Sequence, residues 1–537
     1  MLSMNSNVDS PACGPRFVSF VSFASRSRRE RTPPSLVDVR LDSAQREAIA
    51  LPLGQTLLIL GEAGHGKTTV ALHRLAAIWT ALRKMPGARA RGAVVVPSEG
   101  LARLLQPLLR KLGVDVEART YDAWARNQAR RAFEDLPRRE TETTPAAVQR
   151  LKRDPALRVA LVELVSREPG RIDDDIDAPP VSSNVLVTRG DLQHLFGDRL
   201  LLEAVMRASS MTRAIDVAQT LDHNRVAFGL TTEDEYAHVF DRRRLRALDG
   251  RPLDEGTASA DAGRVDVEDY AVLFELDRLR ASHLGRPATV PRQYDAVLID
   301  EAQELAPLEL ALVGRSLAPG GTLIVAGDAD QHLDPSTAFP GWEATMRELG
   351  SPDYVAVRLD VGYRCPPPIV NLARSVLDPL ASSPSPAAGR QRGRADVLGF
   401  ESPRALIEHL GSGLRELRRR DRRASVAVLC RSPQTAGRIA KSLRDYVPVR
   451  LVYDGRFLPR GAVEVTMVDE VKGLEFDYVV VPDGSDVDYP DSPAARRAMY
   501  VAVTRARFQA IVAYAGVRSP ILPKAISAPQ ELRPTPQ

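Results

Sequence analysis

The chain has 537 residues, too many for a single hydrophobic core, and this length predicts about three domains. Its three cysteines, Cys13, Cys365 and Cys430, are scattered and odd in number, which excludes a disulfide framework and predicts a reducing, cytoplasmic setting. No apolar run is long enough to cross a bilayer, so we expect no membrane association. The net charge of +4 excludes little, but only seven of the 73 basic residues are lysines, so a lysine at a motif position is unlikely to be accidental.

A glycine-rich loop, GEAGHGKTT at 61–69, is the strongest local signal. An apolar run at 56–60 precedes it as a buried strand, and helical spacing follows it at 70–76. The loop fits G-x-x-x-x-G-K-[ST], in which backbone N–H groups and the helix N-terminus hold phosphate oxygens. In that pattern Lys67 reaches the β- and γ-phosphates, and Thr68 is a ligand of Mg²⁺.

Strands and helices alternate on both sides of this loop. Apolar runs at 92–97 and 114–120 are each followed by a helical pattern, which predicts a parallel sheet with helices on both faces. The residues from about 126 to 285 break the alternation with long helical patterns and carry 24 basic against 29 acidic residues. They predict a mainly helical, acidic insertion, in which Asp173, Asp174, Asp175 and Asp177 form a solvated loop or the tip of an arm.

Two further strands end in polar residues that suit a magnesium nucleotide. The strand at 294–299 ends in Asp300 and Glu301, where Asp300 would hold the metal opposite Thr68 and Glu301 would polarise the attacking water. The next strand, at 322–326, leads to Gln331. Because open α/β sheets bind ligands at the carboxyl ends of their strands, we expect these residues to meet.

A second α/β unit is predicted from residue 355. Strands are expected at 355–359, 426–429, 449–452, 463–468 and 478–481, with a final helix and strand across 493–515. The span 379–394 is rich in Pro, Ser, Ala and Gly and predicts a loop. The N-terminal 38 residues are expected to form a flexible arm, and 521–537 a frayed tail.

The ordered set of motifs resembles superfamily 1 helicases of the UvrD/Rep type. The matching segments are the Q-motif glutamine Gln45, the phosphate loop 61–69, VVVPSEGLARLL at 94–105, the region 120–124, DEAQE at 300–304, GDADQ at 327–331, GYRCP at 362–366, KGLEFD at 472–477 and YVAVTRA at 500–506.

The resemblance implies an α/β fold of two RecA-like P-loop NTPase domains, each a parallel sheet flanked by helices, with a mainly helical insertion in the first. The implied boundaries are 39–125 with 286–354 for the first RecA-like domain, 126–285 for the insertion, and 355–520 for the second domain. ATP and Mg²⁺ are the implied cofactors.

The implied ATP site draws residues from both domains. Catalytic roles fall to Lys67, Asp300, Glu301, Gln331, Arg364 and Arg505. ATP contacts fall to Gln45, Gly61, Gly64, Gly66, Lys67, Thr68, Thr69, Tyr363 and Glu475, and metal contacts to Thr68 and Asp300. Gln45 would recognise adenine with Tyr363 stacked on it, Glu475 would contact ribose, and Arg364 and Arg505 would contact the γ-phosphate as arginine fingers.

The activity implied by this family is ATP-driven movement on single-stranded DNA, 3′ to 5′, in DNA repair or recombination. Within the region 120–124, Thr120, Tyr121 and Trp124 would contact or stack on bases, with core packing as the alternative for Trp124. Arginines between 415 and 423 could follow phosphates or form a solvated helix face. We expect a monomer.

Two departures from the family leave other functions open. The segment before KGLE is Met467, Val468 and Asp469, where the family has a threonine and a histidine. The interval between GYRCP and KGLEFD is about 100 residues, too short for the large subdomain of UvrD-type enzymes. The run KTTVALHRLAAIW and the plain KGLEFD are also similar to HelD-type factors, which act on RNA polymerase. The alternatives are therefore a HelD-like remodelling ATPase or the motor subunit of a defence nuclease system.

Overall fold

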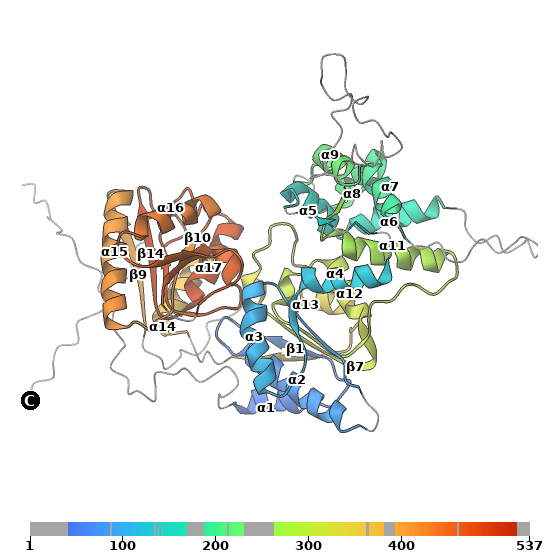
Figure 1. Ribbon diagram of the computed structural model, residues 1–537, viewed down its shortest axis with the longest axis horizontal. Helices are drawn as coiled ribbons and strands as arrows, with labels where there is room; N and C mark the ends of the chain where they lie inside the picture. Colours follow the sequence, from blue (N-terminus) through green and yellow to red (C-terminus); the bar gives the residue numbers. More distant parts are fainter. Residues whose placement is uncertain are drawn as a thin grey trace, which may run out of the picture. The chain divides into compact units, whose positions relative to one another are not determined.

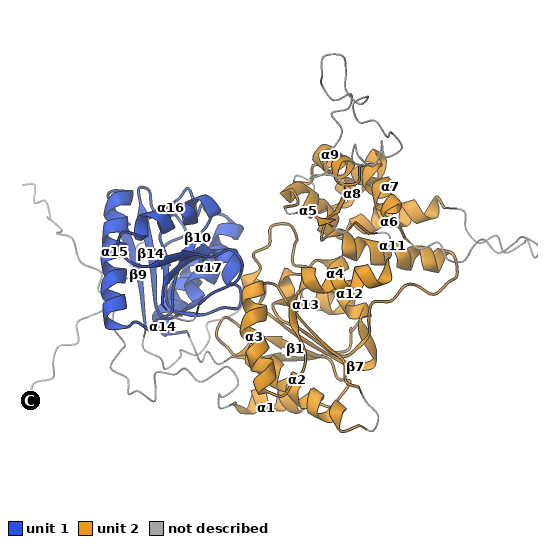
Figure 2. Ribbon diagram, viewed as in Figure 1, with its two compact units in different colours: residues 1–33, 363–381, 388–537 blue, residues 34–362, 382–387 orange. Residues whose placement is uncertain are grey.

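Residues 41–85, 89–133, 136–137, 139–141, 143–168, 187–211, 214–229, 263–360, 365–380, 393–458 and 461–523 are described by the computed structural model. The chain divides into two compact units, one comprising residues 34–362 with 382–387 and the other comprising 1–33, 363–381 and 388–537 (Figure 2). The predicted acidic loop at 173–177, the N-terminal arm and the residues after 523 lie outside the described residues.

The unit that contains the phosphate loop is built on a six-stranded parallel sheet in the order β3-β2-β6-β7-β1-β8. Its strands are β1 (Leu57–Leu60), β2 (Gly92–Val96), β3 (Ala118–Thr120), β6 (Tyr294–Ile299), β7 (Leu317–Gly327) and β8 (Val355–Arg358). Its helices are α1 (Ser43–Ala50), α2 (Lys67–Arg83), α3 (Glu99–Lys111), α4 (Tyr121–Ala132), α12 (Pro307–Arg315) and α13 (Trp342–Glu348), with short 3₁₀ turns η3 (Ala302–Glu304) and η4 (Ala329–Gln331).

Alternate side chains of this sheet enter two separate cores. Leu57 and Ile59 pack with α2 and α3, whereas Leu58 packs on the other face with α4 and α12. Figure 1 shows α2 and α3 on one side of the strands and α4, α12 and α13 on the other. A strand that is buried on both faces reads as a continuous apolar run, which is why LLIL was recognisable as a strand in the sequence.

The insertion between β3 and β6 is mainly helical, and it lies on the side of α4 and α12 (Figure 1). It contains α5 (Ala146–Arg153), α6 (Leu157–Ser166), α7 (Arg189–Gly197), α8 (Arg199–Ala208), α9 (Val217–Ala227), α11 (Asp269–His283) and the paired short strands β4 (Arg139–Glu140) and β5 (Arg264–Val265). One of the long helical patterns expected here, at 146–167, forms two helices, because Pro155 has no N–H to continue the first one.

The other unit has a second six-stranded parallel sheet in the order β11-β12-β10-β13-β14-β9. Its strands are β9 (Arg394–Phe400), β10 (Val426–Cys430), β11 (Val449–Leu451), β12 (Val463–Met467), β13 (Phe476–Val481) and β14 (Ala506–Ala515). Its helices are α14 (Pro367–Leu377), α15 (Pro403–Arg420), α16 (Pro433–Leu443) and α17 (Pro493–Thr504), with the 3₁₀ turn η5 (Val468–Val471). Two parallel sheets flanked by helices confirm the predicted α/β fold class.

One predicted boundary differs from the structure. Residues 355–359 were expected to open the second domain, but β8 pairs in parallel with β1, with Val355 opposite Leu57, and so completes the first sheet. The division between the two units falls after Gly362. A short strand pattern shows that a segment is extended but not which sheet it joins, and this explains the difference.

Candidate ATP site

The phosphate loop joins the carboxyl end of β1 to the start of α2. Gly64 and Gly66 have φ values of 80° and 89°, a left-handed region that favours glycine. Gly66 is the N-cap of α2, and no side chain caps that helix end. The first N–H groups of α2 therefore remain available for an anion, as the sequence pattern requires.

Lys67, the first residue of α2, has a buried ammonium group that lies along the loop. Its Nζ donates to the backbone oxygens of Gly61 at 2.8 Å and Glu62 at 3.2 Å, and it lies 3.9 Å from Oδ2 of Asp328. The ammonium group is thus held at the loop by carbonyl dipoles and one carboxylate. A phosphate can replace these partners without a large movement of the side chain.

Thr68 and Asp300 come together at the ends of two different strands. The Thr68 hydroxyl donates to Oδ2 of Asp300 at 2.7 Å, across 232 residues of sequence. Burial raises the pKa of Asp300 to about 7, with a further contribution from the neighbouring Glu301. A hydroxyl and a buried carboxylate are hard oxygen ligands, and a cation bound between them would favour the charged carboxylate, so the pair fits Mg²⁺.

Glu301 has an unusual backbone conformation. Its φ of 56° makes it the only non-glycine residue with positive φ among those the structure describes. Such a conformation costs about 1–3 kcal/mol and is found preferentially at functional sites. Oε2 of Glu301 accepts a hydrogen bond from Gln303 Nε2 at 2.9 Å, which fixes the direction of the carboxylate.

Gln303 and Asp328 connect the acidic pair to Gln331, although the sequence patterns did not single them out. The Asp328 N–H donates to Oε1 of Gln303 at 3.1 Å, and Nε2 of Gln331 donates to Oδ2 of Asp328 at 2.6 Å. Burial raises the pKa of Asp328 to about 6, although the charge of Lys67 opposes the rise. Their position within DEAQE and GDADQ was the available signal, and the missing information was that the two segments touch.

Gln45 lies next to the phosphate loop. A Cβ added at Gly66 would be 3.2 Å from Nε2 of Gln45. Oε1 of the same Gln45 amide accepts from the Asp42 N–H at 3.1 Å, and the Asp42 carboxylate accepts from the Gln45 N–H at 2.8 Å. This pair of bonds is a capping box for α1. The structure therefore brings Gln45 to the loop and shows a capping role besides the predicted recognition of adenine.

The other predicted positions of the loop are also explained by close packing. Thr69 is buried in the first turn of α2. At Gly61 an added Cβ would be 3.0 Å from the backbone oxygen of Leu359. His65 contacts the same oxygen through Nδ1 at 2.5 Å. The loop is thereby fastened to the residue that follows β8.

Four predicted residues fall within the bounds of the unit that contains the second sheet. Glu475 precedes β13 and Arg505 precedes β14, and these strands pair in parallel with Phe476 opposite Ala506. Glu475 and Arg505 are therefore neighbours at the start of two adjacent strands. The Arg505 side chain is buried and donates to the Val501 oxygen at 3.1 Å. Tyr363 and Arg364 lie outside the described residues.

The three residues predicted to contact DNA are used by the fold itself. Thr120 caps α4 by accepting from the Ala123 N–H. Tyr121 and Trp124 are only 4% and 3% exposed and lie in the hydrophobic core between the sheet and the insertion. Because base stacking requires an exposed ring, neither ring is available for it in this conformation, and core packing, the alternative for Trp124, is what the structure shows.

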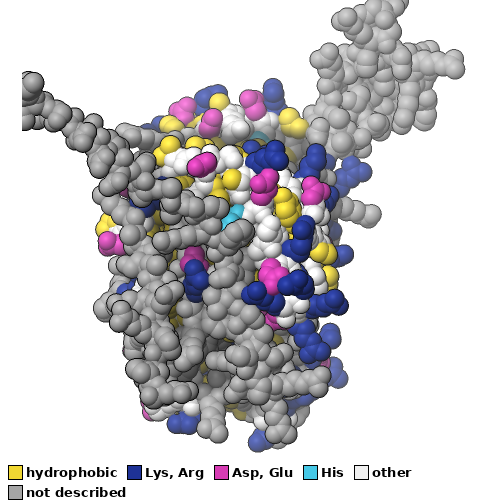
Figure 3. All heavy atoms as spheres, turned by 90° about the vertical axis from the view of Figure 1, so that its left-hand side faces the viewer, with side chains coloured by type: hydrophobic (Ala, Val, Ile, Leu, Met, Phe, Trp, Pro, Cys, Tyr) yellow, Lys and Arg dark blue, Asp and Glu magenta, His cyan; other side chains and the backbone are white. Residues whose placement is uncertain are grey.

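The arginine-rich end of α15 is partly structural. Arg415 donates to the oxygens of Tyr446 and Asp445, and Arg418 donates to those of Ala424 and Ala462. Arg419 and Arg420 both pair with Glu416. Figure 3 views the molecule from the left-hand side of Figure 1 and shows many lysine and arginine side chains on the exposed surface. The side chains of Arg422 and Arg423, which follow the helix, are exposed.

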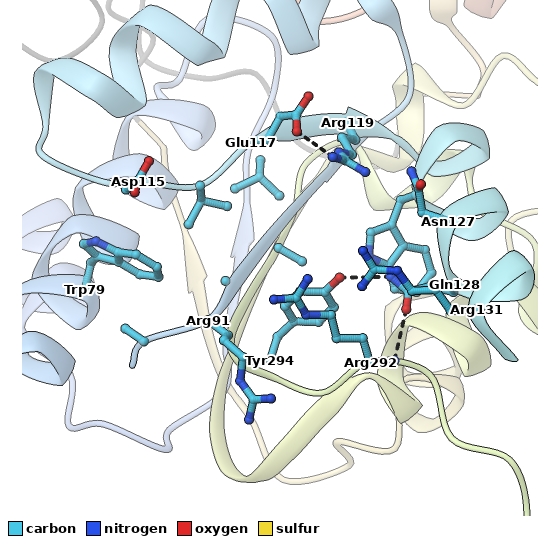
Figure 4. A pocket seen from close by; sticks show the side chains of 16 residues that line it. Trp79, Arg91, Asp115, Glu117, Arg119, Asn127, Gln128, Arg131, Arg292 and Tyr294 are labelled. Atoms are coloured by element: carbon cyan, nitrogen blue, oxygen red, sulfur yellow. Dashed lines mark hydrogen bonds and ion pairs between the residues drawn. The ribbon is translucent and has the colours of Figure 1, made fainter. Parts of the chain in front are cut away.

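A pocket of about 220 Å³ in the first sheet's unit is lined by residues other than those of the candidate ATP site. Figure 4 shows Arg91, Arg131, Arg292 and Tyr294 around it, and Gln128 donates to the Tyr294 hydroxyl at 2.9 Å. Gly92 and Tyr294 begin β2 and β6, so the pocket is at the amino ends of these strands, whereas the phosphate loop and Asp300 follow carboxyl ends. None of the candidate ATP-site residues lines it, whereas Trp124 does.

The fold and the loop geometry are those of a P-loop nucleotide-binding protein. An AAA domain family model matches residues 45–336, which is more than half of the chain, and a UvrD-like helicase C-terminal domain model matches residues 463–513. The chain therefore belongs to the UvrD-like helicases of superfamily 1. At the level of the family, its members use ATP and act on DNA.

Among solved structures, the chain is similar to the C-terminal domain of a possible DNA helicase from Lactobacillus plantarum WCFS1. It is 21% identical, covers 30% of this chain and 92% of its own, and has a TM-score of 0.24. No curated protein matches the chain. Among the residues described here, no helix is both long and apolar enough to span a bilayer.

Proposed function

We propose that this protein hydrolyses ATP and uses the energy to move 3′ to 5′ along single-stranded DNA, in DNA repair or recombination. The observation that carries the proposal is the meeting of Thr68, Asp300 and Glu301 at the carboxyl edge of one sheet, with Thr68 and Asp300 in direct contact at 2.7 Å. These are the groups that a magnesium nucleotide and an attacking water require.

The residues of the first sheet have separable roles in this proposal. Lys67 and the N–H groups of the first turn of α2 bind the phosphates, and Thr68 and Asp300 hold the metal ion. The metal, when bound, neutralises charge that develops on the phosphate oxygens. Glu301 orients the attacking water and accepts its proton, and Gln303 holds the Glu301 carboxylate in place.

The roles of Arg364, Glu475 and Arg505 rest on the family resemblance. If Arg505 stabilises charge in the transition state, Arg505→Ala should lower kcat far more than it raises the dissociation constant for ATP. Steady-state hydrolysis and fluorescent-nucleotide titration measure the two quantities. Equal losses in both would contradict the proposed arginine-finger role.

A remodelling ATPase that acts on RNA polymerase is a second candidate. The observation that favours it is that the described part of 365–523 consists of one sheet with its helices, without the large subdomain that UvrD-type enzymes insert between GYRCP and KGLEFD. The motor subunit of a defence nuclease system is the third candidate from the sequence.

The rate of ATP hydrolysis with and without single-stranded DNA distinguishes these functions. A strong increase with DNA, together with displacement of a label from the 5′ end but not the 3′ end of a strand, supports 3′ to 5′ movement. A rate indifferent to DNA, with RNA polymerase recovered alongside the protein, would overturn the first function in favour of the second.

A further inference from the structure

Arg153 is the last residue of α5, in the helical insertion, yet its side chain points into the sheet domain. Nη2 donates to the backbone oxygen of Glu304 at 2.9 Å and to Oε2 of Glu309 at 2.9 Å. Nε lies 2.9 Å from Oε1 of Glu309, and Nη1 contacts Asp334 and donates to the Ser336 hydroxyl at 2.6 Å. The guanidinium group is thus surrounded by partners that all come from outside the insertion.

Those partners directly follow the two segments that form the ATP site. Glu304 closes the turn η3 that begins after Asp300 and Glu301, and Glu309 caps α12 by accepting from the Ala306 N–H at 2.8 Å. Asp334 and Ser336 follow Gln331 by a few residues. Oε1 of Glu304 also accepts from the Leu333 N–H at 2.8 Å, so the two segments are joined at the point where Arg153 contacts both.

Arg153 has different effects on its two carboxylate partners: burial keeps the pKa of Glu309 above its ordinary value although the charge of Arg153 opposes the rise. Burial acts to raise the pKa of Asp334, but the charge of Arg153 and the hydrogen bonds from Ser336 lower it to about 2. A buried carboxylate that stays charged needs its cation close by. Arg150, one turn earlier on α5, donates to the Pro335 oxygen at 3.3 Å and adds a second link to the same segment.

The residue before Arg153 fixes α5 in the opposite direction. Lys152 is fully buried in the insertion, where its Nζ lies 2.7 Å from both Asp266 and Asp269, and His223 contacts Asp266 at 2.8 Å. Two consecutive residues therefore fasten the end of α5, one to the core of the insertion and the other to the ATP-site segments. Any movement of the insertion that displaces α5 must also displace Arg153.

We propose that Arg153 is a positioning residue through which the helical insertion sets the geometry of Glu301 and Gln331, so that a load on the insertion changes the rate of ATP hydrolysis. The link continues to the reacting groups through Gln303, which bonds Glu301, and through Asp328, which bonds Gln331. The two sets of hydrogen bonds are joined by short stretches of backbone, because Gln303 directly precedes Glu304 and Gln331 lies two residues before Leu333. The inference rests on the proposed hydrolysis of ATP at this site.

Arg158 provides a matched control. It lies on α6 of the same insertion and also contacts the sheet domain, through bonds of 2.8 and 2.7 Å to Glu348 on α13. Its third bond, of 3.1 Å, goes to Glu275 on α11 within the insertion. None of these partners belongs to the segments at 300–304 or 327–336. Arg153→Lys and Arg158→Lys each keep the positive charge and remove the forked geometry, so both test the same chemical change in different places.

The two variants should differ in the kinetics of ATP hydrolysis. We expect Arg153→Lys to lower kcat about tenfold with the KM for ATP within about twofold, because small displacements of reacting groups slow chemistry more than binding. Arg158→Lys should keep kcat within about twofold of the wild type while lowering Tm by a similar amount to Arg153→Lys. Equal kcat in the two variants, or losses that follow Tm in both, would overturn the inference.

Amide hydrogen exchange gives a readout that does not depend on turnover. Arg153→Lys should increase exchange at 302–306 and 331–336 in the nucleotide-free chain, and Arg158→Lys should not. If the wild-type chain hydrolyses ATP but Arg153→Lys leaves the exchange rates unchanged, the positioning role of Arg153 is overturned and the proposed function is not. A wild-type chain that fails to hydrolyse ATP would overturn the proposed function and this inference together.

Discussion

The two sheets have the same number of parallel strands, but the helices that accompany them begin in different ways. In the second sheet's unit, α15, α16 and α17 each begin with a serine followed by proline, and Ser402, Ser432 and Ser492 each accept from the N–H three residues on. In the first sheet's unit, α2 begins at Gly66 with no side-chain cap. A capped helix start satisfies its own donors, whereas an uncapped one presents them to a ligand. Side chains also cap α1, α3 and α4 in the first sheet's unit, so the contrast is between these capped helices and α2, whose uncapped start forms the candidate anion site.

The largest effect should come from the residue that acts on water at the edge of the first sheet. Glu301→Gln removes the proton acceptor and keeps the shape of the side chain, so we expect kcat to fall about 10³-fold. ATP affinity should remain within a few-fold, because Lys67 and the loop still bind the phosphates. Rapid-quench hydrolysis and nucleotide titration check the two expectations. Near-normal turnover would show that another group activates the water.

Lys67→Ala tests whether the open start of α2 binds phosphate. Loss of one charged donor at the phosphates should lower kcat/KM for ATP about 10²–10³-fold. The far-ultraviolet circular dichroism spectrum should not change, because the partners of Lys67 in the nucleotide-free chain are backbone oxygens and one carboxylate. If this variant turns over ATP like the wild type, α2 does not differ in function from the capped helices.

Glu301 and Lys67 also show which parts of the fold and the site could be predicted from the sequence. The phosphate loop, the acidic pair and the strand ends were recognisable because each depends on a short local pattern, and all lie at one edge of one sheet. Contacts between distant segments were not recognisable. Nothing local marks Arg153 as a partner of Glu309, or Tyr121 as a core residue, since both depend on how the insertion packs.

Metal binding should depend on pH through Asp300. Its pKa is raised from 3.8 to about 7, so the nucleotide-free fold holds a proton that the unfolded chain releases, and stability from this group is lost as pH rises through that window. Mg²⁺ needs the charged carboxylate, so its affinity for the nucleotide-bound protein should fall by up to about tenfold per pH unit below 7. Calorimetric titration between pH 5.5 and about 8 measures this, with Asp300→Asn as the control. A flat profile in the wild type would contradict the role of Asp300 as ligand.

The smallest expected effect comes from removing the N-cap of one helix in the second sheet's unit. Ser402→Ala removes the cap of α15 and should lower the free energy of unfolding by about 1 kcal/mol. ATP hydrolysis should not change, because among the described residues the Ser402 side chain bonds only the N–H of Ala405, which has no proposed role in ATP binding. Urea denaturation and a hydrolysis assay on the same preparation measure both. A large loss of hydrolysis with little loss of stability would mean that this helix start also serves a ligand.

The placement of β8 determines which fragments of the chain can be prepared alone. A fragment that stops at residue 354 would lack β8, and β1 would become the outer strand of the first sheet. It would stay paired with β7, but its N–H and C=O groups that face β8 would be unpaired. This strand is apolar, since Leu57, Leu58 and Ile59 are at most 1% exposed in the whole chain. An unpaired apolar edge strand would promote aggregation of the fragment. The same cut would remove Leu359, the partner of His65 in the phosphate loop. An isolated ATP-binding fragment should therefore extend to residue 360.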